Sequence, residues 1–280
     1  METNLLPTMV PLGLLKLILN REMPMPAPRN TFKAMLKSGQ QSVGCWLGMA
    51  DAYAAEISAT AGFDWFLIDG EHAPNDIRSM LAQLQVLGAA NVPALIRPPI
   101  GQTHLIKQVL DIGCQTLIIP MVESAAQAAE LVQAVRYPPH GVRGVGSALA
   151  RASGFSGIPD YLTTANDEIC VIAQVENQAG LDALDDLLAV EGIDGIFIGP
   201  SDLSADLGHI GQPGAPKVVA AIDEALAKIA ASDKASGIMS LDPIAAKAYL
   251  ERGVDFVAVG IDVTIFAKSM RALAAEFKSK

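Results

Sequence analysis

Short apolar runs alternate with longer amphipathic segments along most of this chain. Eight of the runs are apolar at consecutive rather than alternate positions, which is typical of parallel strands covered on both faces. These predicted strands are residues 42–47, 65–69, 94–97, 116–120, 170–176, 195–198, 236–239 and 256–259. Helical spacing lies between them, in segments such as 77–87, 125–135, 218–231 and 243–252.

This order of elements predicts a single (β/α)8 barrel over residues 30–280. Alternating strands and helices favour a parallel sheet, and eight repeats are the number that closes a barrel. A doubly wound open sheet is the alternative. The turn after the first predicted strand lacks the Gly-x-Gly-x-x-Gly pattern of dinucleotide-binding open sheets, so the barrel is preferred.

Residues 1–29 follow a different pattern. Segment 9–19 is apolar apart from Lys16, but it is shorter than the ~20 residues that a membrane-spanning helix needs. Glu2 stands where a signal peptide carries basic residues, and no clear small-residue cleavage site follows. The prolines of segment 23–28 exclude regular helix and central strand. We expect an N-terminal extension here, either disordered or preceding the native start.

Composition narrows the classes of partner. Hydrophobic residues make up 51% of the 280 positions, which is enough for a large core. The net charge of −10 argues against nucleic acid and anionic membranes as partners, because both attract basic surfaces. Cys45, Cys114 and Cys170 are too widely spaced for a disulfide framework or a zinc motif, so we expect reduced thiols in a cytoplasmic protein.

Two long irregular stretches interrupt the repeats. Segment 137–161 lies between the fourth and fifth predicted strands, and segment 199–216 follows the sixth. Loops of this length inside a compact domain are usually functional. His140 and His209 fall in these stretches and are expected in loops that follow strands, whereas His104 is expected on a helix surface.

Polar residues gather where the predicted strands end. The apolar run 65–69 stops at Asp69, and Glu71 and His72 follow within three residues. In a (β/α)8 barrel the carboxyl ends of all strands meet at one mouth, which holds the active site. The candidate residues at these ends are Asp69, Glu71, His72, Arg97, Gln174, Glu176, Gly199, Ser201, Asp202 and Asp262.

Two of these carboxylates suit a hard divalent cation. Glu176 and Asp202 follow neighbouring strands, and Mg²⁺ or Mn²⁺ prefers carboxylate, water and substrate oxygens. Each can also be an ordinary rim carboxylate, and Asp202 can cap a helix. The sequence lacks a His-x-x-x-His or clustered-cysteine motif, which argues against structural zinc.

His72 and Arg97 suit proton transfer and anion binding. A histidine one step past two carboxylates can be tuned as a base near neutral pH, although a histidine just before Pro74 can equally pack a turn. Arg97 can bind a carboxylate through its fork or stabilise a developing oxyanion. Its alternative is an ion pair with Glu71 or Glu176.

Together these residues favour a metal-assisted carbon–carbon lyase. A cation and an arginine can polarise a 2-oxo acid and hold its enolate while a histidine moves the proton. The other aldolase strategy needs a Schiff-base lysine, and none of the predicted strand ends carries a lysine. A catalytically silent barrel that serves as a binding or assembly module is the alternative from another class of protein.

Four motifs give the chain a resemblance to the HpcH/HpaI aldolase family, from about residue 30 to the C-terminus. They are Phe63-Asp64-Trp65 with Ile68-Asp69-Gly70-Glu71-His72-Ala73-Pro74, Gly141-Val142-Arg143-Gly144, Gln174-Val175-Glu176, and Phe197-Ile198-Gly199-Pro200-Ser201-Asp202-Leu203-Ser204. The resemblance implies a (β/α)8 barrel that acts as a class II pyruvate aldolase. It also implies dependence on a divalent cation, which would be Mg²⁺, Mn²⁺ or Co²⁺.

The resemblance implies a role for each matching position. His72 would be the catalytic base, Arg97 would bind the keto acid and stabilise the enolate, and Asp111 would raise the basicity of a histidine, within the chain or across a subunit interface. The remaining roles divide into three groups: Glu176 and Asp202 for the metal, Gln174, Gly199, Ser201 and Asp202 for the substrate, and Asp69 and Glu71 as supports behind these groups.

The implied reaction is the reversible cleavage of 4-hydroxy-2-oxo acids to pyruvate and an aldehyde. A substrate such as 4-hydroxy-2-oxoheptane-1,7-dioate, met in aromatic catabolism, would give succinate semialdehyde. Alternatives are the cleavage of 2-dehydro-3-deoxy-sugar acids and a malyl- or citramalyl-CoA lyase, for which Arg136, Arg143 and Arg151 would form a phosphate-binding patch at the rim. The implied assembly is a homo-hexamer, a trimer of dimers that exchange their last helices. Segment 237–242 departs from the family pattern, so the aldehyde is left open.

Overall fold

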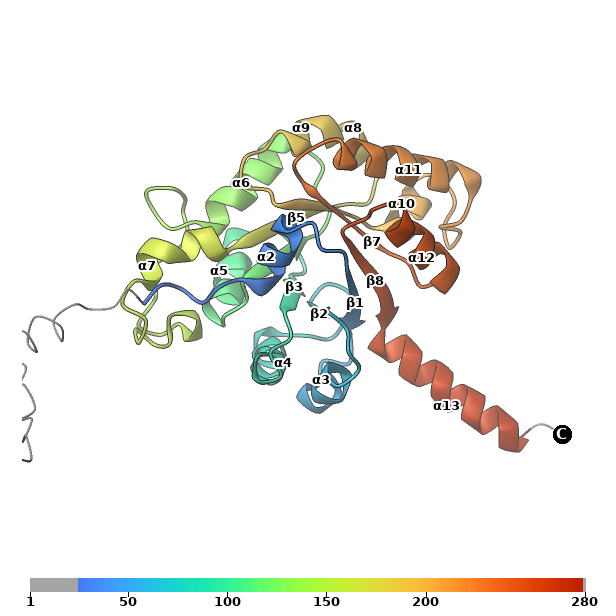
Figure 1. Cartoon of the computed structure of the whole chain (residues 1–280), viewed down its shortest axis with the longest axis horizontal. Helices are drawn as coiled ribbons and strands as arrows, with labels where there is room; N and C mark the ends of the chain where they lie inside the picture. The colour runs from blue at the N-terminus through green and yellow to red at the C-terminus, as the bar shows by residue number, and fades with distance from the viewer. Residues whose placement is uncertain (1–24, 279–280) are drawn as a thin grey trace, which may run out of the picture.

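A closed barrel of eight parallel strands forms the centre of the molecule, as the sequence predicts (Figure 1). The structure, a computed structural model, describes residues 25–278. The strands follow one another around the barrel in chain order: β1 Ser42–Leu47, β2 Trp65–Asp69, β3 Ala94–Arg97, β4 Thr116–Ile119, β5 Cys170–Val175, β6 Gly195–Ile198, β7 Ala235–Met239 and β8 Phe256–Ile261.

The predicted strand ends differ from the observed ones by one or two residues. β4 stops before Pro120, which has no N–H to donate to the ladder. β5 stops before Glu176, whose side chain lines the cavity at the mouth of the barrel. β8 runs on to Ile261, because it pairs with β1 as far as the Trp46–Ile261 register position.

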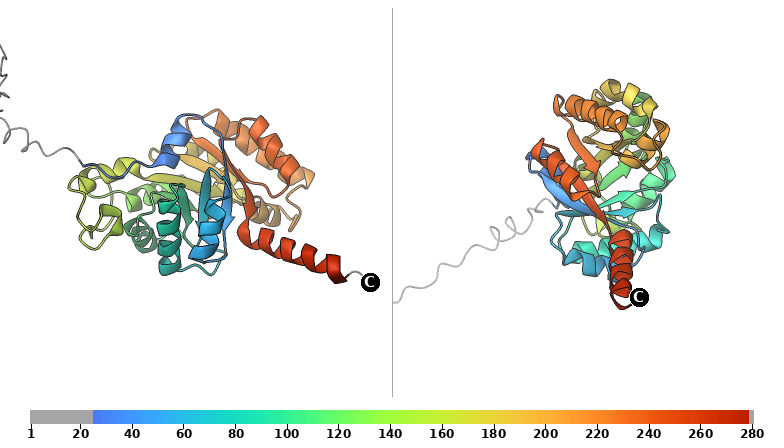
Figure 2. Two further views of the ribbon diagram at one scale, coloured as in Figure 1. Left: turned by 60° about the horizontal axis from the view of Figure 1, so that its bottom comes forward. Right: turned by 90° about the vertical axis from the view of Figure 1, so that its right-hand side faces the viewer.

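Helices surround the barrel, except for the last one. Figure 1 labels them as α2 Thr31–Lys37, α3 Ala52–Ala59, α4 Ile77–Ala89, α5 Thr103–Asp111, α6 Ala125–Val135, α7 Tyr161–Thr164, α8 Gln178–Asp182, α9 Leu184–Leu188, α10 Pro200–Asp206, α11 Pro216–Ala230, α12 Pro243–Glu251 and α13 Asp262–Lys278. Two 3-10 turns, η1 Arg151–Ser153 and η2 Ala165–Glu168, complete the set. Both views of Figure 2 show α13 running away from the barrel. In the described part of the chain, no helix combines the length and apolarity needed to cross a membrane.

The irregular segment 137–161 lies at the end of the barrel where strands begin. Because α6 separates β4 from this segment, the chain enters β5 from the side opposite the mouth. His140 is therefore not in a loop that follows a strand, and that expectation was wrong. Segment 199–216 does follow β6, but it contains α10, which begins at Pro200 because proline presets the backbone angle of a first helical residue.

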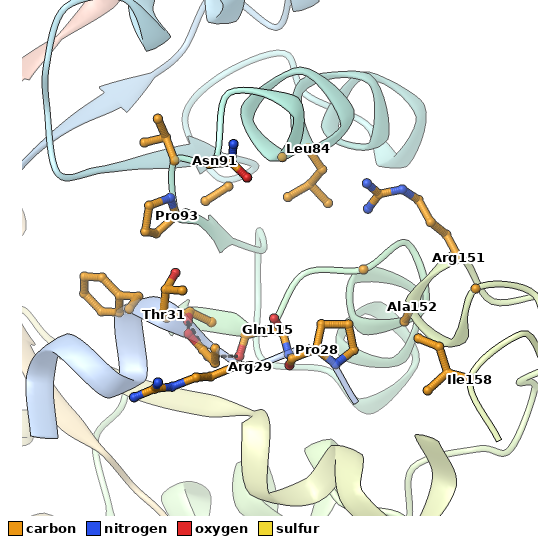
Figure 3. Close-up of a pocket in the computed structure, with 18 of the residues that line it drawn as sticks. Pro28, Arg29, Thr31, Leu84, Asn91, Pro93, Gln115, Arg151, Ala152 and Ile158 are labelled. Atoms are coloured by element: carbon orange, nitrogen blue, oxygen red, sulfur yellow. Dashed lines mark hydrogen bonds between the residues drawn. The ribbon is translucent and has the colours of Figure 1, made fainter. Parts of the chain in front are cut away.

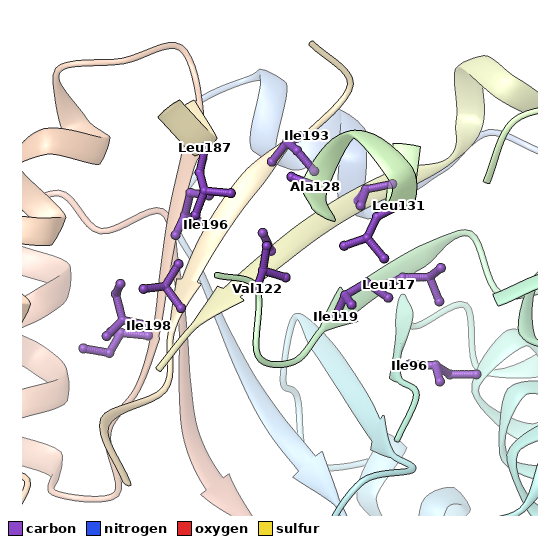
Figure 4. Close-up of a cluster of buried hydrophobic side chains, with 14 of the residues drawn as sticks. Ile96, Leu117, Ile119, Val122, Ala128, Leu131, Leu187, Ile193, Ile196 and Ile198 are labelled. Carbon is purple, nitrogen blue, oxygen red and sulfur yellow. The ribbon is translucent and has the colours of Figure 1, made fainter. Parts of the chain in front are cut away.

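The hydrophobic core has two layers. Inside the barrel, the rings of Phe32, Trp65 and Phe256 meet edge to face, with centroids 5.6 to 6.0 Å apart. Between barrel and helices, aliphatic side chains such as Ile119, Leu131 and Ile198 fill the space (Figure 4). This rigid double layer fixes the strand ends and therefore the residues of the mouth.

Residues 25–30 lie against the barrel. The backbone N–H of Met25 donates to Asp160, and that of Ala27 donates to Thr164. Asn30 begins α2 by accepting from the N–H of Lys33. The domain boundary at residue 30 stays a prediction, and the segment before Met25 lies outside the described residues.

Candidate active site

A cavity of about 410 Å³ opens at the carboxyl ends of the strands. Eight of the predicted site residues line it: Asp69, His72, Arg97, Gln174, Glu176, Gly199, Ser201 and Asp202. Glu71 lies directly behind this lining, against Arg97. Residues predicted at the ends of different strands therefore lie together around one cavity.

Arg97 is held rigidly at the end of β3. Its Nε and Nη2 donate to the two oxygens of Asp69 at 2.9 and 2.7 Å, a two-pronged contact that fixes the plane of the guanidinium. Its Nη1 lies 2.9 Å from Glu71 Oε2, and the guanidinium stacks over Trp46 at 5.5 Å. Burial alone would lower the pKa of Arg97, but the hydrogen bonds and charge of Asp69 outweigh it and raise that pKa. Arg97 is thus a permanent, oriented cation.

Glu176 is a buried carboxylate without a basic partner. Only 2% of the residue is exposed, and none of the ion pairs among residues 25–278 involves it. The N–H of Met121 donates to one oxygen at 2.9 Å and Gln174 Nε2 to the other at 2.5 Å. Burial raises the pKa of Glu176 to about 7, although these two hydrogen bonds oppose the shift. The Glu176 carboxylate would therefore be stabilised by a cation bound beside it.

Gly199 leaves the space that Glu176 occupies. A Cβ at position 199 would lie 2.7 Å from Glu176 Oε2 and 2.9 Å from Glu176 Cβ. These separations are too short for real contacts, and Gly199 has an ordinary negative φ of −98°. The structural reason for glycine here is therefore contact with the carboxylate.

We expect Gly199→Ala to push the Glu176 carboxylate aside and to lower the catalytic rate by about 10²-fold, since displacements near 1 Å cost that much. Steady-state kinetics with thermal unfolding as a folding check would measure it. Gly214→Ala is the matched control, because a Cβ there has nothing within 4 Å. Equal rates for the two variants would contradict the steric role of Gly199.

Asp202 and Ser201 lie in the first turn of α10 and are exposed. The Asp202 charge raises the pKa values of both Glu71 and Glu176, so the three carboxylates share one electrostatic environment. For Glu71 the largest cause of the raised pKa is burial. Asp202 does not accept a capping hydrogen bond: α10 has no side-chain cap, so the alternative reading of this residue as a helix cap is not supported.

His72 reaches solvent at the rim. Its side chain is 64% exposed, and its Nε2 lies 3.8 Å from Glu71 Oε2. The mobility available to an exposed ring suits a proton carrier, but among residues 25–278 of one chain the ring has no hydrogen-bonded carboxylate. Asp262, also predicted at the rim, instead accepts from the N–H groups of Gly48 and Met49 and ties the start of α13 to the end of β1.

Asp111 lies away from this cavity. It is the last residue of α5, and α5 starts near the mouth and ends at the other end of the barrel. There it accepts from Arg143 Nη2 at 3.0 Å. The structure of one chain therefore does not bring Asp111 to His72.

The apolar wall of the cavity was missed by the sequence reasoning. Trp46, Phe197, Met239, Ile261 and Val263 line it. Most of them lie in strands among other apolar residues, so no sequence signal separates cavity-facing from core-facing positions. Of the departing segment 237–242, only Met239 lines the cavity.

A larger cavity of about 530 Å³ lies at the opposite end (Figure 3). It is bounded by residues just before β3 and β4 and by Arg29 and Arg151, which approach from different sides. Arg151 Nη1 donates to the carbonyl of Ile112, so this arginine stabilises the end of α5. Since Arg143 is buried and Arg151 lies at this far end, the expected phosphate-binding patch at the rim was wrong.

Comparison with known proteins identifies the family of the chain. The family model for HpcH/HpaI aldolase/citrate lyase matches residues 42–269. The hydroxypyruvate/pyruvate aldolase of Deinococcus radiodurans is 60% identical over 90% of this chain and 91% of its own. The 4-hydroxy-2-oxo-heptane-1,7-dioate aldolase of Escherichia coli is 52% identical over 89% of this chain and 95% of its own. A crystal structure of an HpcH/HpaI aldolase/citrate lyase family protein from Burkholderia cenocepacia covers 89% of this chain and all of its own with a TM-score of 0.85 and 38% identity. The resemblance carried by the four motifs is thereby confirmed, and the chain belongs to the HpcH/HpaI aldolase/citrate lyase family.

Proposed function

We propose that the protein is a divalent-metal-dependent aldolase that cleaves and forms 4-hydroxy-2-oxo acids. The observation that carries the proposal is that one cavity holds two opposite charges: the buried carboxylate of Glu176, which forms no ion pair among residues 25–278, and the fixed cation Arg97. The names of the relatives from Deinococcus radiodurans and Escherichia coli support this class of reaction.

The donor set fits a hard cation. Glu176 and Asp202 supply carboxylate oxygens, and the buried Gln174 Oε1 has no hydrogen-bond donor among the described residues. Within residues 25–278, no group of three or more His, Cys, Asp or Glu could hold a metal ion. A cation held by Glu176 and Asp202 would thus take further ligands from substrate oxygens and water. When bound, it would supply Lewis acidity toward the keto oxygen. Mg²⁺, Mn²⁺ and Co²⁺ are the candidates.

Each residue of the site then has its own role in the reaction. His72 accepts the proton of the substrate's 4-hydroxyl group. The C3–C4 bond breaks, its electron pair passes into the enolate of pyruvate, and C4 leaves as the aldehyde. Arg97 stabilises the negative enolate oxygen, and Asp69 and Glu71 keep its guanidinium in place. A proton returned to C3 completes pyruvate.

Chelation tests the proposal. Pyruvate or hydroxypyruvate is offered with a panel of aldehydes, before and after exhaustive treatment with EDTA. We expect activity to disappear and to return with added Mg²⁺, Mn²⁺ or Co²⁺. Full activity after chelation would overturn the proposal, and so would a borohydride-trapped lysine adduct with pyruvate.

The acceptor end of the cavity suits an uncharged aldehyde. Apart from Arg97, which pairs with Asp69 and Glu71 and is assigned to the enolate, the cavity lining contains neither lysine nor a second arginine. A distal carboxylate, as in succinate semialdehyde, would be desolvated against Trp46, Phe197 and Met239 without a partner. The same feature favours sugar-acid substrates, whose cleavage gives uncharged hydroxyaldehydes.

We expect kcat/KM for an uncharged aldehyde such as glycolaldehyde to exceed that for succinate semialdehyde by about tenfold or more, since an unpaired buried charge costs over 1 kcal/mol. Competition kinetics with pyruvate would measure the ratio. Met239→Lys places a cation on the apolar wall and is expected to reverse the preference. A preference for succinate semialdehyde in the unaltered protein would contradict the inference.

A second copy of the chain completes the site in this proposal. Along α13, the side chains of Phe266, Met270, Leu273 and Phe277 are 53 to 83% exposed and recur on one helix face. Such an uncovered stripe fits helix exchange between neighbours in a hexamer. The resemblance pairs Asp111 with a histidine. Because Asp111 and His72 lie at opposite ends of one barrel and neither is fully buried, the proposed pairing joins Asp111 of one copy to His72 of another.

Light scattering after size-exclusion chromatography is expected to give six times the 29.3 kDa chain mass. Charges on the stripe, as in Phe266→Glu with Met270→Glu, should yield smaller species, because they would be buried without partners. Ile57→Glu on α3 is the comparison outside the stripe, because Ile57 is also exposed. A monomeric unaltered protein would contradict the assembly.

A further inference from the structure

Arg143 is a fully buried cation that the proposed reaction does not yet use. Its side chain has no exposed surface and lies over the ring of Tyr137 at 4.4 Å. Its Nη2 donates to Asp111 Oδ1 at 3.0 Å and lies 3.5 Å from the hydroxyl of Tyr161. Its Nε and Nη1 have no acceptor among the described residues. Asp111 is therefore the one carboxylate that compensates this charge within the described chain.

Arg143 binds only one of the two carboxylate oxygens of Asp111. Oδ1 holds Arg143, whereas Oδ2 has no donor among residues 25–278 and faces the open space beside Gly146, where a Cβ would still be 3.9 Å away. The carboxylate is 27% exposed. Around it the segment 142–149 presents Val142, Val145 and Leu149, which are 60 to 88% exposed. One oxygen is anchored and the other is offered outward from an apolar surface.

We propose that Arg143 is a positioning residue that orients Asp111 toward the histidine of a second copy. This inference rests on the proposed function, in which Asp111 faces His72 across an interface. Arg143 fixes the carboxylate plane through Oδ1 and leaves Oδ2 to accept from the imidazole. Groups that hold a carboxylate behind a functional histidine fix its orientation and basicity.

A neighbouring arginine joins the same loop to α5 without touching Asp111. Arg151 also reaches the end of α5, but it binds the carbonyl of Ile112 rather than the Asp111 carboxylate. Two arginines thus join the same loop to the same helix end, and one of them touches the side chain in question. This pair supplies a matched comparison.

The experiment compares Arg143→Met, Asp111→Asn, the double variant Asp111→Asn/Arg143→Met, Arg143→Lys and the control Arg151→Met. Methionine keeps the apolar stem on Tyr137 and removes the charge. For each full-length protein, kcat and KM for pyruvate are measured. The titration of His72 is followed by NMR in protein labelled with ¹³C-histidine. His72→Gln assigns the signal among the four histidines.

We expect Arg143→Met and Asp111→Asn each to lower kcat by about 10- to 100-fold with little change in KM, as for other supporting partners. The double variant should be no slower than either single one, because the two residues act as a unit. Arg143→Lys should recover most of kcat, and Arg151→Met should stay within about twofold of the unaltered protein, as expected for a side chain outside the unit. The His72 titration should shift alike in Arg143→Met and Asp111→Asn.

Three results would overturn the inference: a kcat loss in Asp111→Asn that Arg143→Met does not share, losses that multiply in the double variant, or a His72 titration that Arg143→Met does not move. If the unaltered protein has no aldolase activity, the proposed function fails by itself. The His72 titration then still decides the positioning role, because it needs no turnover.

Discussion

Replacing Arg97 by lysine is expected to lower kcat/KM by about 10²- to 10³-fold while the fold stays intact, the loss typical of a missing oxyanion donor. Lysine keeps one positive charge between Asp69 and Glu71, so neither carboxylate is left buried and unpaired. It cannot reproduce the three directed contacts of the guanidinium or its stacking on Trp46. The enolate would then lose a fixed donor and face a mobile one.

Steady-state kinetics at saturating metal would measure this loss, with urea unfolding as the check on stability. Arg252→Lys is the control, because Arg252 forms an exposed ion pair with Asp223 far from the mouth, where loss of geometry costs little. If Arg97→Lys and Arg252→Lys turned over alike, Arg97 would be an internal counter-ion for Asp69 and Glu71. The proposed enolate role would then be withdrawn.

Much of the fold follows from the sequence because the barrel strands are buried on both faces. Such strands are largely apolar on both faces, so their limits can be read from where the apolar run stops, as at Asp69 and Arg97. The same stop marks the mouth, which is why eight of the predicted site residues line one cavity. The end of each apolar run thus predicts both where a strand stops and where the site residues lie.

The remaining features depend on packing that no local pattern records. Trp46 and Phe197 face the cavity and the core from the same apolar strands, so their sequence surroundings are alike. The length of segment 137–161 predicts a functional loop at the mouth, whereas helix α6 before it brings the segment and its arginines to the opposite end of the barrel. The burial of Arg143 against Tyr137 arises from contacts within that irregular segment. Tertiary contacts alone determine these positions.

For Glu176, some properties can be read from the sequence and others only from the structure. Its type and its position just after β5 are visible in the sequence, whereas its burial without an ion pair among residues 25–278 is visible in the structure alone. A buried carboxylate that forms no ion pair among the described residues destabilises the metal-free fold, and the same property makes it a strong cation ligand. Stability and function therefore oppose each other at this residue.

Glu176→Gln is expected to abolish turnover and to stabilise the metal-free protein at pH 8. Because burial raises the pKa of Glu176 from 4.5 to about 7, the folded state retains a proton that the unfolded chain releases between these pH values. The free energy of unfolding of the unaltered protein thus falls as pH rises through this window and levels off above it. Glutamine does not titrate, so the advantage of the variant should grow from near zero at pH 4.5 to about 3 kcal/mol at pH 8.

Urea unfolding in EDTA at pH 5 and pH 8 would measure this difference in the free energy of unfolding. Turnover with Mn²⁺ would measure the loss of activity, which is expected to exceed about 10³-fold because metal polarisation contributes several kcal/mol. Adding Mn²⁺ should stabilise the unaltered protein and leave Glu176→Gln unchanged, since only a state that binds a ligand gains from it. Gln178→Glu, which adds a carboxylate two residues away at an exposed site, controls for charge. A variant that is less stable than the unaltered protein at pH 8 would mean that the hydrogen bonds from Met121 and Gln174 outweigh the burial of the charge.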